Sequence, residues 1–307
     1  MKAIKISLSV VVVAAIAFFV IRSFVDTGKT GEISLPENQF TNRITQEIDS
    51  LGKLPENKFC KDFYREVSYH IDDYAKQGRL GANESENKQW KEHLTKNAYS
   101  AYVGKFISQA FYVFRNSEWK IDDLNFIRSE YQTLRKSELL EKGSPVDKEF
   151  TKIQTVLSKY DEITGFISAC RGFSYSSSGL SDRFPIADMQ TKISRARQYL
   201  SNSLDNAYVK NCTRLHDELK EVPQALFRAH VKYLDNKIAK WSNMYSNYNS
   251  QRDYANDLYR PLKSEIDALD NDIYNVANFD SEYKRLSDKW NEDSRKAYEY
   301  FRNFRNK

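Results

Sequence analysis

A run of apolar residues, spaced alternately by three and four positions, spans residues 231–276. Its members, apolar apart from one arginine, are Val231, Leu234, Ile238, Trp241, Tyr245, Tyr248, Arg252, Ala255, Tyr259, Leu262, Ile266, Leu269, Ile273 and Val276. An apolar position about every 3.5 residues keeps one face of a helix against a partner helix along its whole length. We therefore expect a single helix here, roughly 69 Å long.

Pro261 lies inside this run and removes one backbone hydrogen bond from a helix. Because the apolar spacing continues through it, we expect a kink at Pro261 and no chain reversal. The spacing first slips between Asn278 and Ser281. We expect the long helix to end there and a last helix to follow, with its apolar face formed by Phe279, Tyr283, Leu286, Trp290, Ala297, Tyr300 and Phe304.

Earlier segments repeat the helical spacing over residues 40–51, 59–74, 87–115, 124–134, 144–167 and 186–222. Ser144 followed by Pro145 is typical of a helix start, since a serine hydroxyl caps free N–H groups and proline needs no N–H there. With only 10 Gly and 6 Pro, a fold of many tight turns is disfavoured. The pattern predicts an all-α, elongated multi-helix bundle with long antiparallel, coiled-coil-like helices.

Residues 6–21 read ISLSVVVVAAIAFFVI, and Phe24 with Val25 extends this apolar run toward the length that a bilayer requires. We expect residues 1–25 to form an uncleaved N-terminal transmembrane helix. The alternative is a cleaved signal peptide at Ala15-Ile16-Ala17, but four apolar residues continue past that site. Residues 26–58 are expected to form a juxtamembrane linker with a short amphipathic helix, and residues 59–307 the helical bundle.

Lys2 and Lys5 precede the apolar run, whereas Arg22 and Lys29 after it are offset by acidic neighbours. The positive-inside rule then places the short N-terminus in the cytoplasm and the bulk of the chain in the periplasm of a bacterium, held at the inner membrane. Removing Lys2, Lys5 and Arg22 from the 47 basic residues of the whole chain leaves 44, against 42 acidic residues. Because the net charge of the rest of the chain is close to zero, we expect no nucleic-acid partner.

Three cysteines occur, so at most one internal disulfide can form. If the first four helices of the bundle alternate in direction, Cys60 and Cys170 lie at the same end, which makes them the candidate pair. The alternative is three buried thiols that act as small apolar side chains.

Cys212 and His216 lie one helical turn apart, but two ligands do not make a zinc site, and no second pair completes it. No histidine follows a glutamate by three positions, as di-iron helical bundles require. No catalytic or nucleotide-binding motif occurs either. We expect no catalytic residue, no metal and no cofactor, and we interpret the chain as a non-enzyme.

Residues 171–184 form the longest irregular stretch within the bundle and are rich in Ser and Gly. Loops of this length are often functional. Cations and aromatic rings suit an anionic or peptide partner, and the candidate partner-binding residues are Arg171, Phe173, Tyr175, Arg183 and Phe184. The alternative is a plain connector between helices.

Together these features predict a membrane-anchored, exported helical bundle that acts as a non-catalytic interaction or scaffold module with a protein partner. One alternative keeps the same role but places the bundle in the cytoplasm. A second alternative is a small-ligand sensor or an enzyme with a polar site between helices.

Overall fold

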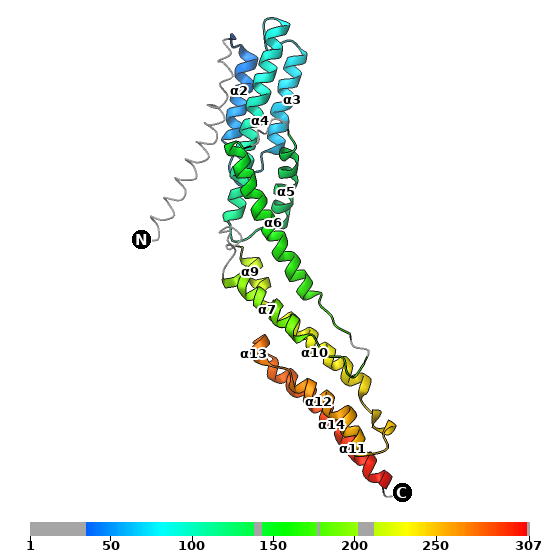
Figure 1. Ribbon diagram of the computed structural model, residues 1–307. Coiled ribbons are helices and arrows are strands. Elements are labelled where there is room, and N and C mark those ends of the chain that lie inside the picture. The colour runs from blue at the N-terminus through cyan, green and yellow to red at the C-terminus, as the bar shows by residue number, and fades with distance from the viewer. Residues whose placement is uncertain (1–34, 138–142, 177–178, 202–211, 306–307) are drawn as a thin grey trace, which may run out of the picture. The chain divides into compact units, whose positions relative to one another are not determined.

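The computed structural model describes residues 35–137, 143–176, 179–201 and 212–305 (Figure 1). Every regular element in these ranges is a helix and none is a strand, which confirms the expected all-α class. The chain divides into two compact units, Met1–Lys159 and Tyr160–Lys307. The proposed anchor at residues 1–25 lies outside the described ranges. Within them, no helix has the length and apolar character needed to cross a bilayer.

Unit 1 contains α2 (Gln39–Gly52), α3 (Lys61–Lys76), α4 (Glu84–Arg115), α5 (Ile121–Arg135) and the first part of α6 (Pro145–Arg171), which runs on into unit 2. Asn38 caps α2 by accepting hydrogen bonds from the N–H groups of Phe40 and Thr41. Its amide also donates to the carbonyls of Arg79 and Leu80, which ties the start of α2 to the α3–α4 turn. The Ser144 hydroxyl accepts from the Asp147 N–H at the start of α6, as its sequence predicts.

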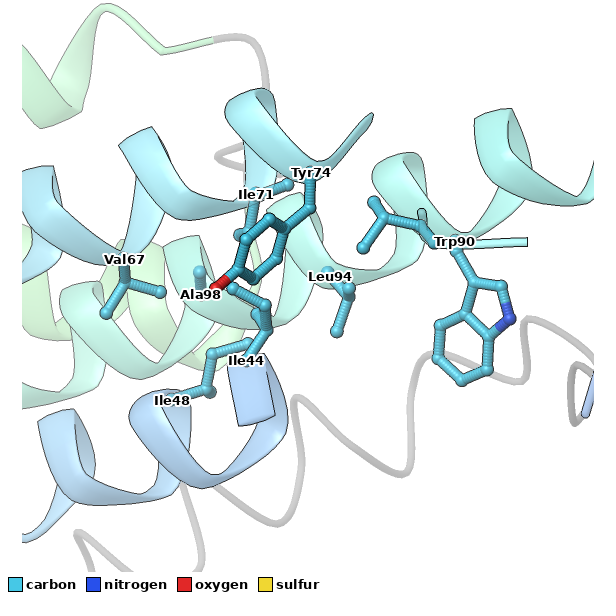
Figure 2. Packing of buried hydrophobic residues seen from close by; sticks show 9 residues of the cluster. Ile44, Ile48, Val67, Ile71, Tyr74, Trp90, Leu94 and Ala98 are labelled. Atoms are coloured by element: carbon cyan, nitrogen blue, oxygen red, sulfur yellow. The ribbon is translucent and has the colours of Figure 1, made fainter. Parts of the chain in front are cut away.

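The first three helices of unit 1 share one apolar core (Figure 2). Ile44 and Ile48 of α2 point toward side chains of the other two helices, and all of these residues are buried. The contributions of α3, the α3–α4 turn and α4 are Val67, Ile71, Tyr74, Leu80, Trp90, Leu94 and Ala98. The short amphipathic helix expected in the linker is therefore an integral part of unit 1.

The remaining half of α4 packs against α5 and α6, and this region encloses a buried carboxylate. Phe150 of α6 contacts Phe106 and Tyr131, with ring centroids 5.9 and 5.5 Å apart. Glu130 of α5 accepts from the Tyr102 hydroxyl at 2.5 Å and from the Lys61 ammonium. Glu130 therefore links α5 to α4 through Tyr102 and to α3 through Lys61.

Unit 2 is built around α10 (Val222–Trp241), which follows the short α9. The chain reverses after α10, returns through a broken helix and reverses again into α14, so that the three stretches lie side by side (Figure 1). Besides α10 and the end of α6, the elements that the structure describes in this unit are α7 (Ile186–Ser201), α9 (Thr213–Lys220), η1 (Met244–Asn247), α11 (Gln251–Tyr254), η2 (Ala255–Tyr259), α12 (Arg260–Asp267), α13 (Asn271–Tyr274) and α14 (Phe279–Arg305).

The prediction of one continuous helix over residues 231–276 is wrong. Helix α10 ends at Trp241, and Asn243 adopts a left-handed conformation with φ of 62°. The Asn243 N–H donates to buried Asp293 of α14 at 2.7 Å, which holds the turn in place. Because the return helix keeps the same apolar spacing, the run that suggested one long helix is a hairpin whose two halves face each other.

The chain remains helical through Pro261, as predicted. A π-helical turn, Ala255–Tyr259, precedes it, and the Arg260 N–H reaches back five residues to the Ala255 carbonyl. This wider turn accommodates the proline ring and its missing donor. The helix next breaks at residues 268–270, between α12 and α13, which the apolar spacing does not predict. A further break falls at residues 275–278, just before the expected position, where Asn275 takes a φ of 52°.

Candidate functional site

The aromatic residues of the Arg171–Phe184 segment pack onto α10. The Phe184 ring is 4% exposed and stacks on His230, with centroids 4.0 Å apart and planes 4° from parallel. Tyr175 contacts both Phe184 and Tyr233, at centroid distances of 5.9 and 5.5 Å. Phe173 meets the edge of Phe184. Three of the five candidate partner-binding residues therefore lie against their own unit.

The two arginines of this set remain at the surface. Arg171 lies 3.6 Å from Glu218 and Arg183 lies 3.4 Å from Glu265, with side chains 47% and 56% exposed. The segment is anchored by its rings and presents its cations outward. Its role in binding a partner stays a prediction.

Beneath this segment lies a closed polar network that sequence reasoning missed. Lys237 of α10 donates to Glu265 Oε2 at 2.6 Å, to the Asp182 carbonyl at 2.5 Å and to the Tyr233 hydroxyl at 3.0 Å. All three N–H donors of the ammonium are thereby used. The Tyr233 hydroxyl also lies 2.7 Å from Glu265 Oε1. With side chains 1% and 5% exposed, the Lys237–Glu265 ion pair is sealed from solvent.

His230 adjoins this network and is also buried. Its Nδ1 lies 2.9 Å from the Tyr274 hydroxyl, whereas its Nε2 is buried with no hydrogen-bond partner among the described residues. Burial lowers the pKa of His230 to about 3, because a charged ring would lose its hydration there. The imidazole is therefore neutral at neutral pH.

A different face of α10 borders an open groove beside the start of α14. Its lining residues are Phe227, Arg228, Val231, Lys232, Asp235, Asn278 and Glu282. Arg285 donates to both oxygens of Asp235, at 2.9 and 2.6 Å, and to Glu282 at 2.8 Å. These bonds to Arg285 hold the pKa of Asp235 below its usual range. Arg228 and Lys232 are exposed and form no ion pair with any described residue.

The three cysteines are buried free thiols. Cys60 lies in unit 1, where it donates to the Gln109 side chain, and Cys170 lies in unit 2, so the Cys60–Cys170 disulfide stays a prediction. Cys212 directly precedes α9, which carries His216. Among the residues that the structure describes, no group of three His, Cys, Asp or Glu side chains could hold a metal ion.

The residues of the closed network gave only a weak signal in the sequence. Tyr233 and Lys237 are four residues apart and thus share a helix face, but Glu265 follows 28 residues later. Lys237 and Glu265 come together only because the chain reverses after α10, and the continuous apolar spacing gives no sign of that reversal. Nothing in the sequence indicates that Nε2 of His230 is buried without a hydrogen-bond partner.

No family model matches this chain, and neither a curated protein nor a solved structure matches it. Two features stand out in unit 2: a sealed polar network under the Arg171–Phe184 segment, and a groove with two exposed, unpaired cations along α10.

Replacing one member of the sealed ion pair should destabilise unit 2 more than replacing both. Lys237→Met leaves the Glu265 carboxylate buried without its main partner, at a cost of about 3–5 kcal/mol, whereas the double variant K237M/E265L leaves no buried charge there. Native-state hydrogen exchange of α10 and α12 measures both changes. Equal or larger loss of protection in the double variant would contradict this account.

Acidification should destabilise the folded protein through His230. The unfolded state takes up a proton near pH 6.5, whereas the folded state resists protonation until about pH 3. Stability from this group is therefore complete above pH 6.5 and falls by about 1.4 kcal/mol per pH unit below it. Urea unfolding at pH 7.5, 6.0 and 5.0 should give a shallower decline for His230→Gln, which cannot titrate. Parallel declines for the two proteins would show that His230 has no such effect.

Proposed function

We propose that this chain is a non-catalytic interaction or scaffold module, held at the bacterial inner membrane by residues 1–25 with its helical units in the periplasm. The observation that carries the proposal is the groove beside α10 and α14. Its rim presents two cations, Arg228 and Lys232, that no described side chain neutralises, although every other charge along this rim is paired.

The arrangement of the buried charges supports the same role. A catalytic acid or base must reach its substrate, but Lys237 and Glu265 are committed to each other inside unit 2. Glu130 is likewise committed to Tyr102 and Lys61 inside unit 1. These buried groups stabilise helix packing. The charged side chains that a partner can reach are therefore those on the surface of the helices.

A photo-crosslinking amino acid placed at Lys232 should capture a partner in the native host. The same amino acid at Lys88, an exposed lysine of α4 in unit 1, serves as the control. We expect a discrete, light-dependent adduct of higher mass from position 232 and none from position 88. Failure to form any adduct at position 232, or identical adducts from both positions, would contradict a docking role for the groove.

The opposite orientation, with the helical units in the cytoplasm, is the second candidate. Three free, buried thiols favour it, since the cytoplasm keeps cysteines reduced. A C-terminal alkaline phosphatase fusion should be active if the proposed orientation is right, because that enzyme needs the oxidising periplasm. An inactive phosphatase together with a bright C-terminal fluorescent-protein fusion would establish the cytoplasmic orientation instead.

A further inference from the structure

We infer that residues 179–184 form an acid-sensitive strap on α10, which is released when His230 takes up a proton while the helix itself stays folded. The inference goes beyond the proposed interaction function and does not depend on it. It rests on how Phe184 and Asp182 hold the strap, and on what surrounds the His230 ring.

The strap is an irregular segment, since residues 179–184 belong to no helix. Its buried Phe184 ring stacks on His230, with centroids 4.0 Å apart. The Asp182 carbonyl accepts from the Tyr233 hydroxyl at 2.7 Å and from the Lys237 ammonium at 2.5 Å. Because a short irregular segment opens at a lower free energy than a packed helix does, the strap can leave α10 while the helix remains in place.

The His230 ring has no counterion. Its Nδ1 lies 2.9 Å from the Tyr274 hydroxyl of α13, and its buried Nε2 has no hydrogen-bond partner among the described residues. The titratable groups that face the ring are Tyr274 and, on α10 itself, Tyr233. Burial raises the pKa of Tyr274, so its hydroxyl stays neutral.

The charged groups beyond Tyr233 do not compensate a proton on His230. Lys237 and Glu265 both bind the Tyr233 hydroxyl, but they are already paired with each other at 2.6 Å. A protonated His230 would therefore carry a buried positive charge and a second N–H without an acceptor.

Release of the strap removes this penalty and breaks few bonds. Phe184 covers one face of the imidazole ring, so its release lets water reach the ring and hydrate the charge. Tyr274 need not move, because its hydroxyl oxygen can accept from a protonated Nδ1. The Lys237–Glu265 ion pair, which joins α10 to α12, persists because neither residue belongs to the strap.

Acid favours the open strap because only the open state binds the proton readily. Burial lowers the pKa of His230 to about 3 in the closed state, whereas a solvated histidine titrates near pH 6.5. Above pH 6.5 neither state is protonated, so the opening equilibrium is independent of pH. Below pH 6.5 the opening constant rises by up to about tenfold per pH unit, which gives about tenfold between pH 7.5 and 5.5.

Trypsin can measure this release at the Arg183–Phe184 bond. To be cleaved, the chain must lie extended in the protease, which requires Phe184 to leave His230, and cleavage of such an open state tracks its population. The full chain in detergent is digested at pH 7.5, 6.5 and 5.5. Each rate is divided by that of a synthetic peptide of residues 179–189 at the same pH. We expect this ratio to rise about tenfold from pH 7.5 to 5.5.

Two variants remove the titrating group in different ways. His230→Phe keeps a flat ring against Phe184, and His230→Gln keeps a polar partner for Tyr274. In both, the ratio should change by less than about twofold over the same pH range. The matched control His93→Gln, at a partly buried histidine of α4 in unit 1, should retain the rise seen in the unaltered protein.

Three results would overturn the inference. The first is a ratio that stays constant between pH 7.5 and 5.5 in the unaltered protein. The second is a rise of equal size in both His230 variants. The third is equal acceleration of cleavage at the Lys232–Tyr233 bond within α10, which would show that acid opens the whole unit and not the strap.

Discussion

The helices of both units are joined by buried carboxylates that accept one hydrogen bond from a tyrosine hydroxyl and one from a lysine ammonium. Glu130 does so with Tyr102 and Lys61 in unit 1, and Glu265 does so with Tyr233 and Lys237 in unit 2. A buried carboxylate without such partners would cost several kcal/mol. Each group therefore fixes which helix faces can pack together, because any other alignment leaves a charge unpaired.

A tyrosine hydroxyl bonded to a carboxylate recurs elsewhere in the chain, which has 20 tyrosines. A buried tyrosine contributes a large apolar surface but also a hydroxyl that needs a partner, and a carboxylate from the facing helix supplies one. Tyr254 pairs in this way with Asp293 at 2.9 Å, and Asp293 in turn accepts from the Asn243 N–H at the hairpin turn. Burial raises the pKa of Tyr102 and of Tyr254, so both remain protonated donors.

Helical spacing predicted the all-α class, the start of α6 and the continuity of helix through Pro261, because each depends on residues close together in sequence. The hairpin after α10 could not be predicted in this way. Its two arms keep the same apolar phase, and the turn depends on Asn243 reaching Asp293, 50 residues away. For the same reason Lys237 and Glu265 form no recognisable motif in the sequence. The aromatic residues of the Arg171–Phe184 segment are recognisable in the sequence, but the spacing does not show that they pack inward.

Helix α10 shows how one element serves two purposes through its different faces. Tyr233 and Lys237 form part of the inner face, where all three donors of the Lys237 ammonium are used. Arg228 and Lys232 form an outer face, where the charge is left open. Because the Lys237–Glu265 ion pair is buried, the inner face of α10 stabilises the packing of unit 2, whereas Arg228 and Lys232 on its outer face remain exposed to solvent.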